Sequence, residues 1–122
     1  MAAFLSDEWF ASLAADDVGL SDCKVDVTIT GAPGGDARWH VDVVGAHLTA
    51  ASGTAPRAAV ALTLSYDDSV AILRGELEAS VAFMQGKMKT AGDPGQLLDV
   101  LAATARPGFR TARDELAAAT EL

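Results

Sequence analysis

Polar and apolar side chains alternate with a period of two in residues 24–30, 38–44 and 58–64. This period predicts β-strands with one buried face. The apolar positions are Val25, Val27 and Ile29, then Trp39, Val41 and Val43, then Val60, Leu62 and Leu64. The glycine-rich residues 31–36 predict a hairpin loop, and a weaker strand is expected at 47–51. Consecutive strands of this kind predict an antiparallel sheet that is covered on one side.

Helical signals stand on both sides of these strands. Ser6 is a candidate N-cap for a first helix with Leu5, Trp9 and Leu13 on one face, expected to stop near residues 16–19. Four further helices are expected in the second half of the chain. They begin after the cap Ser65, near residue 78, at Asp93-Pro94 and at Pro107-Gly108. Residues 87–91, between the second and third of these four, are expected to form an edge strand.

This order of elements predicts an α+β fold, an antiparallel sheet with helices gathered on one face. The length of 122 residues fits one domain, and we expect residues 1–122 to form a single unit.

Composition and charge exclude several classes of function. The net charge is −8, and the basic residues are scattered apart from two small local groups, Lys87 with Lys89 and Arg106 with Arg110 and Arg113, so nucleic-acid binding is not expected. The same charge leaves room for transient, local membrane contact at most. No apolar stretch approaches the length of a membrane span, no secretory signal is evident, and there is a single cysteine, so we expect a cytoplasmic protein.

Residues that carry catalytic or metal chemistry are few. His40 and His47 lie in neighbouring predicted strands without an evident third ligand, so no metal site is expected. Cys23 has no helix start or basic run beside it, which favours a structural thiol. No nucleophile motif or phosphate-binding glycine loop occurs, and Asp67-Asp68 is explained by helix capping. We therefore expect no catalytic residue, no cofactor and no enzymatic activity.

A cluster of bulky apolar residues in the second half is the strongest candidate for a site. Phe83, Met84 and Met88 fall on more than one face of a short helix and its flank. Core packing is the simpler interpretation. Methionine is nevertheless frequent at adaptable binding surfaces, and the alanine-rich elements around it leave volume to be filled.

The same region resembles the sterol carrier protein 2 family of lipid-binding domains. The resemblance is carried by Leu62-Thr-Leu, Asp67-Asp68, Gly75-Glu76-Leu77, Ala82-Phe83-Met84-Gln85-Gly86-Lys87-Met88-Lys89 and Gly92-Asp93. It is strong over residues 58–101, and the order of elements agrees over nearly the whole chain. The resemblance implies a stand-alone domain with an antiparallel sheet of about five strands, roofed by helices and enclosing an apolar tunnel.

The resemblance also implies ligand-binding residues. Leu73, Leu77, Phe83, Met84 and Met88 are expected beside the tunnel, with Leu97, Leu98, Leu101 and Phe109 in its wall or lid.

Three functions are compatible with these observations. The leading hypothesis is non-catalytic binding, and transfer, of a sterol, fatty acid, acyl-CoA or similar lipid. The alternative is an accessory domain with a closed tunnel that binds a protein partner and supports a lipid- or quinone-related enzyme. A small enzyme would need a polar cluster inside the pocket, and its best candidates, His40 and Asp42, are expected to point away from it.

Overall fold

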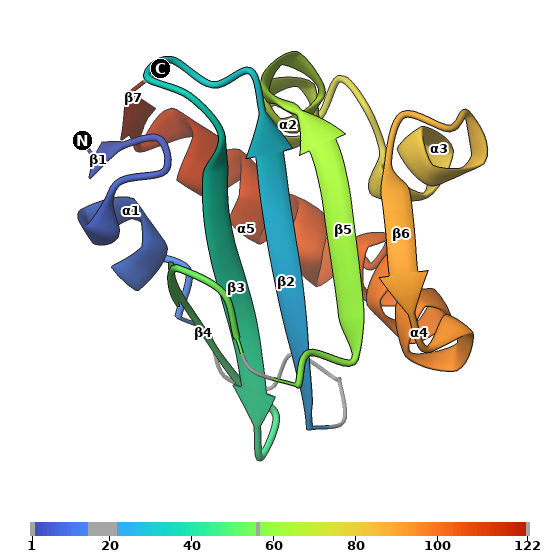
Figure 1. Cartoon of the computed structure of the whole chain (residues 1–122). Coiled ribbons are helices and arrows are strands. Elements are labelled where there is room, and N and C mark those ends of the chain that lie inside the picture. Colours follow the sequence, from blue (N-terminus) through green and yellow to red (C-terminus); the bar gives the residue numbers. More distant parts are fainter. Residues whose placement is uncertain (1, 15–21, 56, 122) are drawn as a thin grey trace.

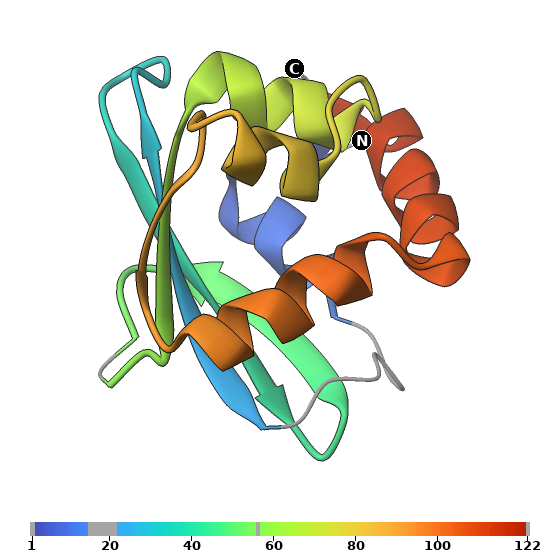
Figure 2. The ribbon, with the colours of Figure 1, turned by 90° about the vertical axis from the view of Figure 1, so that its right-hand side faces the viewer.

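A five-stranded sheet with helices on one face forms the body of the protein (Figures 1 and 2). The structure is a computed structural model, and it describes residues 2–14, 22–55 and 57–121. The strand order is β4-β3-β2-β5-β6. The strands are β2 (Cys23–Thr30), β3 (Ala37–Val44), β4 (His47–Ser52), β5 (Val60–Ser65) and β6 (Lys89–Gly92), and the helices are α1 (Asp7–Ala11), α2 (Tyr66–Leu73), α3 (Ala79–Met84), α4 (Pro94–Thr104) and α5 (Pro107–Ala118).

The α+β class is confirmed, but the sheet is mixed rather than antiparallel throughout. β2 and β3, β3 and β4, and β5 and β6 pair antiparallel, whereas β2 and β5 run parallel, with Val25 opposite Val60 and Ile29 opposite Leu64. The reason is the link between β4 and β5. It carries the chain past β3 and β2 instead of turning it in a hairpin, and a crossover of this kind can join strands in parallel.

The β4–β5 link crosses the face of the sheet opposite the helices, as Figure 2 shows. Two backbone groups fix it there: the Ala55 N–H donates to Asp26 Oδ1 at 2.7 Å, and the Ala59 N–H donates to the Lys24 carbonyl at 2.9 Å. Ala55 is buried as a result. The polar side of β2 therefore holds a connection and is partly covered by it.

The core lies between the sheet and the helices, where the alternating pattern placed it. β2 and β5 bury every second residue, and apart from Cys23 the buried side chains belong to the predicted apolar set. Their main partners from the second half are Ala82, Met88, Leu97 and Leu101. Each fully buried Val, Leu, Ile or Met side chain contributes about 1.5–3 kcal/mol, so this layer is the main source of stability.

A second cluster and a small second sheet close one end of the molecule. Trp9, Phe10 and Leu73 are buried together, and Trp39 links them to the main sheet with its ring centroid 5.8 Å from that of Trp9. β1 (Ala2–Ala3) pairs in parallel with β7 (Thr120–Glu121), which joins the two terminal segments. No sequence pattern predicted this pair.

The predicted helix caps are confirmed. Ser6 Oγ accepts from the Trp9 N–H at 3.2 Å, Ser65 Oγ from Asp68 at 3.1 Å, and Asp93 Oδ1 from Gly95 at 2.8 Å. These caps satisfy backbone donors that the first helical turn leaves free.

The predicted end of α1 near residues 16–19 is wrong. α1 ends at Ala11, and the following Ser12 is its C-cap, with its hydroxyl donating to the Trp9 carbonyl at 2.6 Å. Residues 16–19 themselves lie outside the described part of the chain.

Candidate functional site

An apolar groove lies between α3 and α4. Its volume is about 350 Å³ and it opens to solvent. Seven residues line it: Ser80, Phe83, Met84, Leu98, Leu101, Ala102 and Ala105. None of the seven carries a charge, so the groove offers apolar surface and little that would orient a polar ligand.

The local sequence explains why α3 presents bulky residues to this groove. Ala79 and Ala82 are buried, Ala82 completely, so their small side chains let α3 sit close to the sheet. Ser80, Phe83 and Met84 lie on other sides of the same short helix. Gly75, with φ +77°, ends the preceding turn in a conformation that glycine adopts without strain.

α4 supplies the opposite wall with the residues that share one face. Leu98, Ala102 and Ala105 are spaced four and three apart, and successive residues at that spacing align along a helix. Leu97 and Leu101 face the core, and Leu101 also reaches the groove. The two small alanines leave the open volume between the helices.

The structure brings four of the nine predicted ligand-binding residues into the groove: Phe83, Met84, Leu98 and Leu101. The other five lie elsewhere: Met88 and Leu97 in the main core, Leu77 packed against that core, Leu73 in the cluster with Trp9, and Phe109 on α5, 41% exposed. Whether these nine hold a ligand stays a prediction, as does the enclosed tunnel.

Sequence reasoning missed Ser80, Ala102 and Ala105. Their small side chains gave no hydrophobic signal of their own. The available signal was their position: Ala102 and Ala105 follow Leu98 on one helical face, and Ser80 precedes Met84 by one turn.

Ion pairs link the residue before α3 to α5. Glu78 precedes α3, and its Oε1 lies 3.6 Å from Arg110 Nη2 and 3.9 Å from Arg113 Nη1. These ion pairs join α5 to the α2–α3 connection. Arg113 is the better buried partner, with 11% of its side chain exposed.

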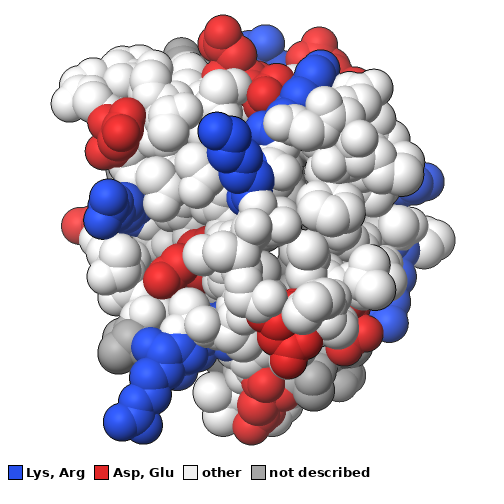
Figure 3. All heavy atoms as spheres, turned by 45° about the vertical axis from the view of Figure 1, so that its right-hand side comes forward, with Lys and Arg blue, Asp and Glu red and all other residues white. Residues whose placement is uncertain are grey.

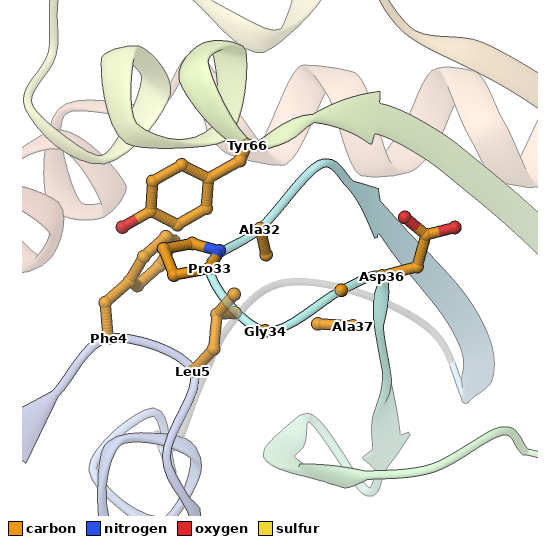
Figure 4. A pocket seen from close by; sticks show the side chains of 9 residues that line it. Phe4, Leu5, Ala32, Pro33, Gly34, Asp36, Ala37 and Tyr66 are labelled. Carbon is orange, nitrogen blue, oxygen red and sulfur yellow. The ribbon is translucent and has the colours of Figure 1, made fainter.

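A second pocket of about 300 Å³ lies at the β2–β3 hairpin (Figure 4). Phe4, Leu5, Pro33 and Tyr66 gather on one side of it, and the rings of Phe4 and Tyr66 have centroids 5.8 Å apart. In Figure 4 the carboxylate of Asp36 points away from these rings, and its Oδ1 accepts from the Gly31 N–H at 3.1 Å. The loop backbone supplies much of the remaining lining. Of the two, the α3–α4 groove is the better site for an apolar ligand.

Candidate polar chemistry lies away from the groove. Among the described residues, no three His, Cys, Asp or Glu side chains come together as a metal site. His40 and Asp42 alternate with the core-facing residues of β3, so they lie on the opposite side of the sheet from the helices. His40 Nδ1 lies 2.9 Å from the Gly53 carbonyl oxygen.

Cys23 is a buried residue of the core cluster, as predicted for a structural thiol. Burial, reinforced by the negative charges of Asp22, Asp42 and Asp99, raises the pKa of the Cys23 thiol. A raised pKa keeps the thiol protonated and makes it a poor nucleophile at neutral pH.

The helices are short. Within the part of the chain that the structure describes, none is long and apolar enough to cross a lipid bilayer.

The geometry defines a small α+β domain with an apolar groove between helices on one face of a mixed sheet. The SCP-2 sterol transfer family matches this chain over residues 14–103. The chain belongs to that family, as the sequence resemblance predicted.

Individual relatives agree with this assignment. The chain is 31% identical over 77 residues to sterol carrier protein 2 of Gallus gallus, which covers 62% of this chain and 14% of the chicken protein. The chain thus spans only a small part of that relative.

Solved structures show the same fold. Palmitated SCP2L2 from Aedes aegypti aligns with a TM-score of 0.62 at 22% identity, over 70% of this chain and 75% of that one. A crystal structure of sterol carrier protein 2 aligns with a TM-score of 0.65 at 16% identity, over 91% and 98% of the two chains.

Proposed function

We propose that this protein binds the apolar part of a lipid in the groove between α3 and α4 and carries it without making or breaking a bond. The observation that carries the proposal is the groove itself, which is lined by Phe83, Met84, Leu98 and Leu101 and has no charged lining residue. Such a surface gains about 25 cal/mol for each Å² of apolar area that a ligand covers. A polar metabolite would gain little binding free energy there, because it has little apolar area to bury.

Membership of a sterol transfer family supports a lipid as the ligand class. A fatty acyl chain is the first candidate within that class, because the mosquito relative with the same fold was solved in its palmitated form. Sterols and acyl-CoA belong to the same proposal. The groove would then be the open mouth of a path between the helices and the sheet, which is how an apolar tunnel would be reached.

The absence of a bond-making step is also part of the proposal. It is supported by the position of His40 and Asp42 on the far side of the sheet and by the buried, protonated state of Cys23. A carrier needs neither an acid–base pair nor a nucleophile. We propose further that residues 1–122 act as one unit and that this unit works in the cytoplasm.

Native mass spectrometry of gently purified protein tests the proposal directly. We expect a population heavier than the polypeptide, and solvent extraction of it should release a lipid. In parallel, purified protein should take up a fluorescent fatty acyl probe, which unlabelled fatty acid should displace. A chain that purifies free of ligand and also fails to take up the probe would defeat the proposal.

A second candidate function follows from the chicken relative, of which this chain spans only 14%. Domains of this kind occur within longer proteins, so the chain could act as an accessory domain that presents a substrate to an enzyme. A stable protein partner in pull-downs, combined with failure to take up acyl or sterol probes, would favour this function over the carrier.

A further inference from the structure

Positive charge is concentrated in two segments of this acidic chain. Residues 79–92 and 100–113 contain five of the nine basic residues and none of the seventeen acidic ones. The five are Lys87, Lys89, Arg106, Arg110 and Arg113. The rest of the chain is therefore even more acidic than the net charge of −8 suggests.

These two segments form the surroundings of the groove. The first contains α3, the turn after it and β6, and the second contains the later part of α4 and the beginning of α5. Lys87 follows Met84 by three residues, and Arg106 follows the groove residue Ala105 directly; both basic residues are exposed. Exposed basic residues thus lie close in sequence to both walls of the groove.

Exposed large apolar residues gather on the same helices. Met84 is 76% exposed on α3, Leu98 61% on α4 and Phe109 41% on α5. Val44, at 65%, lies on β3 instead. Apolar side chains that stand out of a protein beside basic ones are typical of surfaces that contact the interface of a membrane.

Four acidic residues flank the two segments: Glu78, Asp93, Asp99 and Asp114. Asp93 accepts from backbone N–H groups at the start of α4, and Asp114 is paired with Arg113. Glu78 is paired with Arg110 and Arg113. Asp99 is turned by about a quarter of the helix circumference from Leu98, and its charge acts on Cys23 in the core. Figure 3, which brings this side of the molecule forward, shows a broad uncharged area at the right with basic side chains at its margins and acidic ones above and below it.

We infer that the face formed by α3, α4 from Leu98 onward and the start of α5 docks on an anionic lipid membrane, with the mouth of the groove toward the bilayer. Met84, Leu98 and Phe109 enter the interface, and Lys87 and Arg106 lie among the phosphates. The overall negative charge does not prevent this contact, because salt screens charges that lie more than about 8–10 Å away. The inference rests on the proposed function for its purpose, since a docked groove receives a lipid without exposing it to water.

Sedimentation with lipid vesicles tests the docking face. The full chain is mixed with vesicles of phosphatidylcholine alone or of phosphatidylcholine and phosphatidylserine in equal parts. We expect binding to the mixed vesicles, weaker binding as salt is added, and little binding to phosphatidylcholine alone. Each basic residue at an anionic surface contributes about fivefold in affinity.

The decisive variant is Lys87→Glu with Arg106→Glu. Its matched control is Lys24→Glu with Arg38→Glu, which makes the same charge change at exposed positions of β2 and β3. The first variant should bind the mixed vesicles at least about tenfold more weakly. The control should keep most of its binding. Circular dichroism and thermal melts establish that both variants are folded.

Three results would overturn the docking face: no binding to mixed vesicles, equal loss in both charge variants, or binding that does not depend on phosphatidylserine. A dimer that Leu98→Gln dissociates, detected by light scattering, would assign the face to a second copy of the chain and would also overturn it.

Uptake of the fluorescent acyl probe in the absence of vesicles separates this inference from the proposed function. The Lys87→Glu and Arg106→Glu variant should retain probe uptake within about twofold. Vesicle binding without probe uptake would refute the carrier function and leave the docking face standing.

Discussion

The indole N–H of Trp9 donates a hydrogen bond to the hydroxyl of Thr120 across 3.0 Å, joining residues that are 111 positions apart. Both residues are buried, Trp9 to 4% exposure and Thr120 to 5%. The Thr120 hydroxyl in turn donates to the Leu116 carbonyl. This contact, together with the pairing of β1 and β7, fixes α5 to the first helix.

Thr120→Val keeps the shape of the side chain but removes its hydroxyl. The Trp9 N–H then remains buried without an acceptor, which costs about 1–3 kcal/mol of unfolding free energy. Urea unfolding measures this loss. Thr111→Val is the matched control, since Thr111 is an exposed residue of α5 whose hydroxyl also donates to a backbone carbonyl. This control should change the unfolding free energy by less than about 0.5 kcal/mol. If Thr120→Val and Thr111→Val lowered the unfolding free energy equally, the hydrogen bond to Trp9 would contribute nothing to stability.

Local signals in the sequence predicted most elements, but not how distant segments meet. Ser65 and Asp93 mark helix starts because their side chains act within one turn, and the alternation in β2 marks a buried face because side chains alternate on any strand. Neither signal carries strand direction. The parallel pairing of β2 with β5 and the β1–β7 pair, whose partners Ala2 and Thr120 lie at opposite ends of the chain, therefore required the structure.

Gly92 stands where β6 meets β5, and its backbone leaves no room for a side chain. Its φ is +109°, and a Cβ added there would lie 2.2 Å from the Ala59 carbonyl oxygen. Gly92→Ala should therefore lower the unfolding free energy by more than about 3 kcal/mol, from backbone strain and from overlap together. Thermal or urea unfolding provides the measurement.

Gly86→Ala is the control for that substitution. Gly86 also has a positive φ, +74°, but a Cβ there meets nothing within 4 Å. Only the conformational cost of about 1–2 kcal/mol should appear. If the two variants were equally stable, the close approach of Gly92 to Ala59 would have no energetic consequence.

The sequence predicted which types of residue line the candidate site better than it predicted which way their side chains point. Leu97 and Leu98 were both placed in a ligand wall, but adjacent residues on a helix point about 100° apart, so only one of them can face the core. Leu97 is buried and Leu98 is 61% exposed. The helical stripe does not reveal which leucine faces outward, because that depends on where α3 packs.

Ala102→Trp tests the groove by filling it. Ala102 is exposed on α4 and lines the groove, so a large ring at this position occupies the space between the helices without disturbing the core. The affinity for a fluorescent fatty acyl probe should fall at least about tenfold, while the unfolding free energy changes by less than about 0.5 kcal/mol. Ala112→Trp, at an exposed position of α5, should leave probe affinity unchanged. Unaltered affinity in Ala102→Trp would place the ligand elsewhere.

The pH dependence of stability tests whether Cys23 is buried in the core. Burial raises the pKa of the Cys23 thiol in the folded protein, and nearby carboxylates raise it further, because both disfavour the thiolate. In the unfolded chain the thiol ionises near pH 8.5. The fold therefore keeps its full stability below that pH and loses part of it as the pH rises from there toward the folded pKa. We expect the unfolding free energy of the wild-type chain to decline more between pH 8 and pH 10 than that of Cys23→Ala, measured by urea unfolding.

Iodoacetamide should also alkylate the native thiol at least about tenfold more slowly than the urea-unfolded one at pH 8. Rapid alkylation of the native chain, or identical pH profiles for the two proteins, would contradict the buried position of Cys23.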